Sequence, residues 1–195
     1  DTPADVDVYN SDHYDEQLPG MSNQLFVGKY PGKLGNSIKA IAIDNHGWMQ
    51  AFNLAVGSRS VDQVRFLANF DAAPPHTSRA MKAANGQGPN DTGLGFDEMH
   101  ILIIDEDGLW TGTPGYILEK HAYVSKASDA KRIDGSSNYV GTVLRNESAY
   151  IWLGPAANLT SSSAASGSEA SAGSSMAGTV FKQIDGTGKE IVGGS

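Results

Sequence analysis

Histidines have the most versatile side-chain chemistry in this sequence, because a neutral imidazole can bind a metal or move a proton near neutral pH. The chain has five of them: His13, His46, His76, His100 and His121. None is spaced from another as in H-x3–5-H or H-E-x-x-H, and there is no cysteine to complete a thiolate site. His100 and His121 fall inside predicted strands, where a hydrogen-bonded, half-buried imidazole is the commoner role. We therefore expect no metal site.

The most concentrated acidic residues are Asp105-Glu106-Asp107-Gly108. A calcium loop needs acidic or amide side chains at alternate positions before its glycine, followed by a distant glutamate. Here the glycine comes too early and Leu109 stands next to it. The cluster is more typical of a turn between two strands, where aspartate and glycine supply the backbone conformations.

Nucleophile and phosphate motifs are also missing. The nearest approach to G-x-S-x-G is the stretch 167–171, GSEAS, which has the wrong form. The stretch 86–88, GQG, lacks the third glycine of a dinucleotide loop, and no G-x4-G-K-[ST] occurs. We expect no catalytic residue, no cofactor-binding residue and no enzyme activity. A hydrolase whose carboxylate pair converges only in space leaves no motif, so it stays as an alternative.

Two tryptophans suggest a different kind of site. Trp48 or Trp110 could serve as a stacking platform if the chain were an exposed β-sandwich that binds a ligand or a glycan. Packing in the core is the other role open to each of them. The sequence leaves both roles open.

Charge is unevenly distributed along the chain. Of the 22 acidic residues, six lie in the first twenty positions, which contain no lysine or arginine; they are Asp1, Asp5, Asp7, Asp12, Asp15 and Glu16. The formal net charge of −8 therefore belongs mainly to this leading segment. No cluster of basic residues could neutralise phosphates, and no apolar run approaches the roughly 18 residues of a membrane span. We expect neither nucleic acid nor a membrane as a partner.

The element pattern predicts a loop-rich, mainly β protein with short helices. Apolar and β-branched runs predict strands at residues 24–29, 37–44, 98–105, 109–111, 116–125 and 150–153. The strand 37–44 alternates as a strand with one buried face should. Residues 77–85 and 139–146 fit short helices, residues 62–70 fit either a strand or a helix, and residues 48–56 show no clear period. Turn residues dominate at 30–36 and 45–47.

Composition divides the chain into four parts. Residues 1–23 are expected to form an acidic loop or arm, and residues 24–154 the folded domain. Residues 155–178 consist largely of Ser, Ala and Gly and are expected to form a flexible loop. Residues 179–195 regain ordinary apolar content and end on Ile191-Val192-Gly193-Gly194-Ser195, which predicts the start of a further, truncated segment.

Four stretches, taken in order, resemble one known family. They are residues 27–36, VGKYPGKLGN; residues 75–78 with 96–108, PHTS and FDEMHILIIDEDG; residues 117–130, ILEKHAYVSKASDA; and residues 150–153, YIWL. They resemble the family patterns A-[KR]-Y-P-G-x-x-G-N, P-x-T-S with D-E-x-H-[VI]-[LV]-[VI]-[VI]-D-x-D-G, V-L-E-K-[FY]-x-Y-[VL]-S-K-A-S-D-A and Y-I-[WY]. The family is the contractile tail sheath proteins of T4-like bacteriophages. The resemblance covers about residues 24–154, and His121 stands where the family usually has an aromatic residue.

The resemblance implies a fold and a structural role. The fold would be an outer sheath domain, a two-layer antiparallel β-sandwich with small flanking helices, taken from the middle of a longer polypeptide. Its partners would be other sheath subunits in hexameric rings, and the tail tube protein through regions outside this chain. The assembled sheath contracts and drives the tube through the host envelope. The protein would be made in the host cytoplasm and reside in the virion, and we expect the isolated chain to be monomeric.

Overall fold

The computed structural model describes residues 8–20, 26–30, 32–74, 98–125, 130–154, 182–184 and 191–192. The helices are α1 (Ser11–Gln17), α2 (Lys33–Asn36), α3 (Asn45–Asn53), α4 (Val61–Asn69) and α5 (Val140–Glu147), with short 3-10 turns η1 (Leu18–Gly20) and η2 (Val56–Ser58). The strands are β1 (Phe26–Gly28), β2 (Ile38–Asp44), β3 (Glu98–Asp105), β4 (Tyr116–Ser125), β5 (Ile151–Leu153), β6 (Lys182–Ile184) and β7 (Ile191–Val192). The predicted strands at 24–29, 37–44, 98–105, 116–125 and 150–153 and the helix at 139–146 are therefore confirmed.

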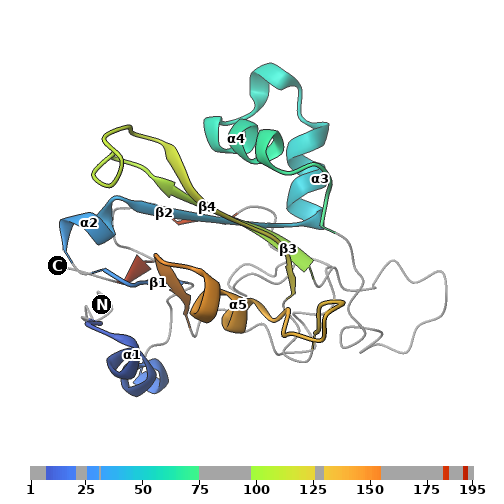
Figure 1. Cartoon of the computed structure of the whole chain (residues 1–195). Helices are drawn as coiled ribbons and strands as arrows, with labels where there is room; N and C mark the ends of the chain where they lie inside the picture. Colours follow the sequence, from blue (N-terminus) through green and yellow to red (C-terminus); the bar gives the residue numbers. More distant parts are fainter. Residues whose placement is uncertain are drawn as a thin grey trace.

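The strands form two sheets, one above the other (Figure 1). The larger sheet has the order β4-β3-β2-β6, and each neighbouring pair is antiparallel. In the smaller sheet β1 pairs antiparallel with β5 and parallel with β7. The α+β, mainly β class with two layers of antiparallel strands and small helices is confirmed.

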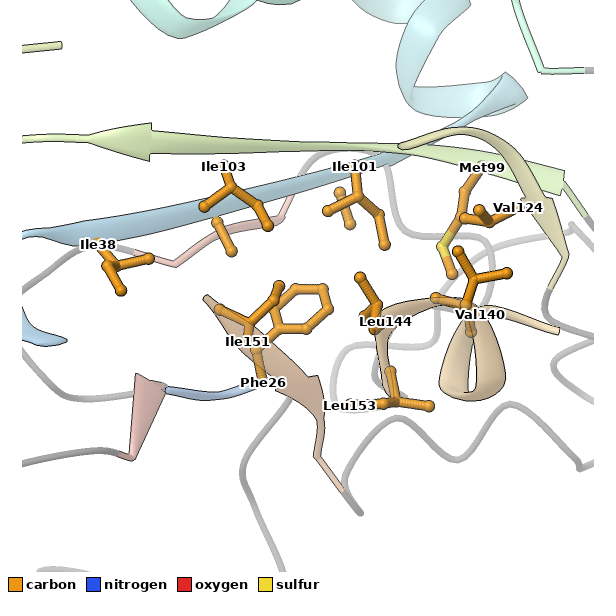
Figure 2. Close-up of a cluster of buried hydrophobic side chains, with 13 residues drawn as sticks. Phe26, Ile38, Met99, Ile101, Ile103, Val124, Val140, Leu144, Ile151 and Leu153 are labelled. Atoms are coloured by element: carbon orange, nitrogen blue, oxygen red, sulfur yellow. The ribbon is translucent and has the colours of Figure 1, made fainter. Parts of the chain in front are cut away.

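The main core fills the space between the two sheets (Figure 2). Ile101 and Ile103 of β3 point down towards Phe26 of β1 and Ile151 of β5, and Leu144 of α5 closes one side of this core. All five side chains are fully buried. Burying each such side chain contributes roughly 1.5–3 kcal/mol to stability.

A second core lies on the opposite face of the larger sheet. Ile41 of β2 and Leu102 of β3 point to that face and pack against Trp48 of α3 and Phe66 of α4. The expectation of one buried face for the strand 37–44 is therefore wrong, because α3 and α4 cover the face that would otherwise meet water (Figure 1). The polar residue that alternation placed on that face, Lys39, is only 3% exposed.

The helices correct two further expectations. Residues 45–47, expected as a turn, form the beginning of α3, which also settles the undecided stretch as helix up to Asn53. The stretch 62–70 is helical up to Asn69, and α4 begins with a capping box in which Ser60 and Gln63 satisfy each other's backbone N–H groups. Lys33–Asn36, expected within a loop, forms the short helix α2.

The acidic leading segment is also more ordered than expected over its described part. Residues 11–17 form α1, which is capped by the side chain of Asn10, rather than a loop or arm. Tyr14 stacks on Trp152 with ring centroids 4.8 Å apart, and its hydroxyl donates to the Leu153 carbonyl at 2.6 Å. Asp15 pairs with Arg145 of α5 through two contacts of 2.6 Å. The helix forms because its one large aromatic side chain finds a buried partner on the smaller sheet.

Other expectations lie outside the described residues. These expectations are the helix at 77–85, the glycine-rich stretch around 86–88, the loop or arm over residues 1–7, and the flexible Ser/Ala/Gly loop at 155–178.

The return strand expected at 109–111 is wrong, because the chain makes a longer loop and the next strand begins at Tyr116. The buried carboxylate of Asp105 accepts hydrogen bonds from the backbone N–H of Trp110 at 3.0 Å and of Thr111 at 2.8 Å. Those N–H groups are therefore used within the loop instead of in a sheet ladder.

Gly108 is the position in this loop where an added side chain would meet backbone atoms. Its φ angle is +76°, and a Cβ there would lie 2.7 Å from the Pro114 nitrogen. We expect Gly108→Ala to lower the free energy of unfolding by about 2 kcal/mol. Gly112 is the matched control, because its φ angle is +81° but a Cβ there meets nothing within 4 Å. Gly112→Ala should cost about 1 kcal/mol in urea unfolding, and equal losses for the two variants would contradict the close-contact argument.

Candidate functional site

His100 is fully buried, and its ring contacts Trp48, Phe66 and Phe70 of the second core. The backbone N–H of Tyr123 donates to its Nδ1 at 3.1 Å, so Nδ1 carries no proton. Its Nε2 then donates to the Ala72 carbonyl at 2.9 Å. Phe70 stacks on the imidazole with centroids 4.2 Å apart, and burial lowers the pKa of His100 to about 4. This imidazole is neutral, with both nitrogens used, as expected for a histidine that holds structure.

Tyr123 shows what His100 holds in place. It is in the left-handed region with a φ angle of 57°, next to an irregularity in the pairing of β3 with β4. Its N–H is taken by His100, and its carbonyl accepts from the Asn138 side chain at 2.8 Å. These two bonds offset the strain of a non-glycine residue at positive φ.

The other described histidines also have structural surroundings. His121 is 8% exposed, and its Nε2 lies 3.0 Å from Glu119 Oε2. Burial would raise the pKa of Glu119, but hydrogen bonds from His121, the Ala149 N–H and Ser148 outweigh it and lower the pKa. His13 stacks on Tyr9. Among the described residues, no three His, Asp or Glu side chains converge as a metal site would require.

The acidic cluster at 105–108 divides between two structural tasks. Asp105 is fully buried and also accepts from Ser37 Oγ at 2.6 Å and from Thr111 Oγ1 at 2.9 Å. Burial would raise the pKa of Asp105, but these hydrogen bonds lower it. Glu106 instead faces Lys39 of β2 at 3.1 Å. The carboxylates thus organise the loop and tie the end of β3 to Lys39 of β2.

A buried charge network went unnoticed in the sequence. Lys39 Nζ lies 2.8 Å from Asp62 Oδ2 and 3.1 Å from Glu106 Oε1, and Asp62 Oδ1 lies 3.2 Å from Arg65. Lys39 and Asp62 are buried where α4 packs on β2. A lysine in an alternating strand looks like a solvent-facing residue, so no sequence signal distinguishes it from an exposed one.

The two candidate stacking tryptophans have different surroundings. Trp48 is 6% exposed and packs edge-on against Phe66, so the core role is the right one for it. Trp110 is partly exposed, and its ring meets Tyr30 and Tyr150 edge-on at 4.7 and 5.1 Å. Its Nε1 donates to the Leu34 carbonyl at 2.8 Å. Only Trp110 is placed where a ligand could reach an aromatic cluster.

Exposed apolar side chains without a described partner occur on α3, η2, α4 and the links between them. Six exposed apolar side chains gather within sixteen residues: Met49, Phe52, Leu54, Val56, Val61 and Val64. We call these six residues the hairpin face. In Figure 1 α3 and α4 stand above the larger sheet, away from β1, α5 and α1. The arrangement offers an apolar contact surface rather than a reaction centre.

The sequence predicted only part of the arrangement of α3 and α4. The hydrophobic residues of 48–56 and 62–70 were visible, but their division into a buried and an exposed set depends on the helices packing on the sheet. Trp48, Ala51 and Phe66 point inward, whereas the hairpin face points outward. The signal that could have revealed it is an excess of apolar residues over what one helix face can bury.

Comparisons with known proteins add no relative. No protein-family model matches the chain, and no curated protein is similar to it. Among the described helices, none is both long and apolar enough to cross a membrane.

Proposed function

We propose that this chain is part of a structural subunit of a contractile phage tail sheath. In this role the intact polypeptide polymerises in hexameric rings around the tail tube, and the sheath contracts to drive the tube through the host envelope. The subunit is not an enzyme and resides in the virion. The observation that carries the proposal is the order of the four family-like stretches along residues 24–154.

The described parts of these stretches hold the fold together, which supports a mechanical role. Lys29, from the first stretch, donates to the carbonyls of Leu144, Arg145 and Ser148 at the end of α5. Asp105, from the second, organises the loop after β3. His121, from the third, ties β4 through Glu119 to the chain before β5. A domain that transmits force needs such cross-links between elements more than it needs a cleft.

Contraction itself requires no cofactor in this proposal. A lattice of subunits assembled in a metastable arrangement releases free energy when its contacts rearrange. The subunit contributes stiff domains with two well-packed cores, such as the two on either side of the larger sheet. Chemical steps are not part of this mechanism.

Electron microscopy tests the proposal on the full polypeptide that contains this chain. We expect regular tubes or sleeves, formed alone or around tail tube protein. A polypeptide that stays dispersed under assembly conditions, with and without tube protein, would overturn the proposal.

The glycan-binding alternative would use the cluster of Trp110, Tyr30 and Tyr150, in which the Trp110 ring meets both tyrosine rings edge-on. On a glycan array it requires reproducible binding that is lost in Trp110→Ala. Binding that survives this substitution would not come from the cluster, and the sheath proposal is unaffected by either result.

A further inference from the structure

A third buried cluster lies apart from the two cores, on the outer face of the smaller sheet. Val27 of β1 and Trp152 of β5 are paired in this sheet and point away from the main core, because they alternate with residues that enter it. In Figure 1 α1 lies below β1, on the side away from the larger sheet. The other described members of the cluster all come from residues 8–18, which we call the strap: Val8, Tyr14 and Leu18.

Few side chains hold the strap on this face. Val8 is fully buried, and Tyr14 is 7% exposed. The Tyr14 ring stacks on Trp152, and its hydroxyl donates to the Leu153 carbonyl. Leu18 is only partly buried. The attachment therefore depends mainly on two side chains, of which Tyr14 is the larger.

Opposite charges add a weak attraction between the strap and the face. The first twenty residues contain no lysine or arginine, and Asp15 pairs with Arg145 of α5. The two side chains are 46% and 48% exposed, so water and salt screen this pair. Lys29 Nζ lies 5.3 Å from the centre of the Trp152 ring and donates to carbonyls at the end of α5. The face is thus aromatic and cationic, whereas the strap is acidic.

The conformational entropy of the strap opposes its docking. Helix α1 has seven residues, whereas an isolated helix shorter than about 12–15 residues is marginal in water. The helix therefore persists only while it is docked, and docking orders the whole strap for the burial of Val8 and Tyr14. The main core contains thirteen buried residues, none of them from the strap. The free energy that holds the strap is therefore much smaller than the free energy that holds the sheets together.

We propose that the strap opens and closes as one unit while both cores stay folded. Its residues belong to neither core. Val27 and Trp152 keep their places when it opens, because their strand neighbours Phe26 and Ile151 are part of the main core. Opening therefore uncovers the aromatic, cationic face without unfolding the sheet that carries it. The strap is a reversible cover of this face, and this inference does not depend on the proposed sheath function.

A protease that cleaves after glutamate measures the open fraction. Cleavage between Glu16 and Gln17 requires an open strap, whereas cleavage after Glu119 in β4 requires the larger sheet to unfold. When opening is fast compared with cleavage, each rate is proportional to the open population. Mass spectrometry assigns the cuts, and a synthetic peptide of residues 8–20 gives the rate for a fully open strap. For the unmodified chain we expect cleavage after Glu16 at roughly 1–10% of the peptide rate, and cleavage after Glu119 at least about tenfold slower again.

Three variants identify what holds the strap, each compared with a peptide that carries the same substitution. Tyr14→Ala removes the aromatic anchor and should raise cleavage after Glu16 by about tenfold or more, close to the peptide rate. Asp15→Asn removes only the exposed ion pair, so the increase should stay below about fivefold. Tyr9→Ala is the matched control, because Tyr9 lies in the same strap but is 63% exposed, and it should change the rate by less than about twofold. Cleavage after Glu119 should stay the same in all three variants.

Three results would overturn the proposal. The first is cleavage after Glu16 no faster than after Glu119 in the unmodified chain, because the strap would then open only with the whole fold. The second is cleavage after Glu16 at the peptide rate in the unmodified chain, because the strap would then never close. The third is a Tyr14→Ala variant that accelerates both cuts equally, or that accelerates the cut after Glu16 no more than Tyr9→Ala does. None of these results bears on whether the full polypeptide forms tubes in the electron microscope, so the two proposals fail separately.

Discussion

Replacing Lys39 by methionine is expected to lower the free energy of unfolding by about 3 kcal/mol. Methionine fills a similar volume but leaves Asp62 buried under α4 without the ammonium that lies 2.8 Å away. Arg65, at 3.2 Å and partly exposed, compensates only in part. Glu106 lies nearer the solvent, with 36% of its side chain exposed, and relaxes towards water. The loss is therefore mainly the cost of one uncompensated buried carboxylate.

A double substitution separates the lost ion pair from lost packing. In Lys39→Met with Asp62→Leu both charges are gone, so we expect most of the stability to return. Lys120→Met is the control, since Lys120 is an exposed lysine of β4, and it should change stability by less than about 0.5 kcal/mol. Urea unfolding measures all three. A loss in Lys39→Met no larger than in Lys120→Met would show that the buried pair contributes nothing.

Stability is expected to fall as the pH drops from about 6.5 towards 4, because of His100. In the unfolded chain the imidazole takes a proton near its ordinary pKa of 6.5, whereas in the fold its pKa is lowered to about 4 by burial. Between these values the unfolded state binds more protons, so stability rises with pH and is lost on acidification. The full window corresponds to about 3 kcal/mol.

The geometry explains why the folded protein resists this protonation. A proton on Nδ1 would point at the Tyr123 N–H, which now donates to that nitrogen. The rings packed around His100, those of Trp48, Phe70 and Tyr123, carry no negative charge at these pH values to stabilise an imidazolium. Acidification should therefore loosen the attachment of α4 and of the β4 irregularity first.

His100→Leu tests this assignment by urea unfolding at several pH values. The variant should be less stable at pH 7, by roughly 1–3 kcal/mol, because the Tyr123 N–H and the Ala72 carbonyl lose their partner. Its stability should nevertheless change little between pH 6.5 and 5, where carboxylates such as Asp105 and Glu119 remain ionised because their pKa values are lowered. His13→Gln is the control and should keep the slope of the unmodified protein. An unchanged slope in His100→Leu would show that another group titrates.

The strands were the part of the fold most open to prediction. Residues 98–105 and 116–125 were predicted with the bounds that β3 and β4 have, because β-branched and aromatic runs bounded by turn residues have few alternatives. The strand at 109–111 failed because Asp105 takes up the backbone N–H groups that a ladder would need. The local sequence around Asp105 does not show whether its carboxylate folds a loop around itself or lies in a simple hairpin turn.

The helices and the candidate surface were less predictable. Residues 45–47 contain good turn formers, yet α3 begins there because Trp48 and Ala51 can both reach the core one turn apart. Helix α1 depends on Tyr14 stacking with Trp152, a partner far along the chain. The hairpin face exists only because these helices bury their other side. Such outcomes depend on contacts that local patterns do not encode.

By itself, the sequence determined the positions of five strands, the absence of cysteine, the concentration of acid in the first twenty residues and the resemblance to tail sheath proteins. These are local or compositional properties, so each can be found without knowing which residues meet. Only the tertiary structure decided that β2 and β3 are buried on both faces, that Lys39 is an internal cation, and that His100 is a neutral, hydrogen-bonded core residue. The physical reason is that the burial of a residue depends on which helices and strands pack against its own element. Whether Lys39 meets water or Asp62 depends on where α4 packs, more than twenty residues further along the chain.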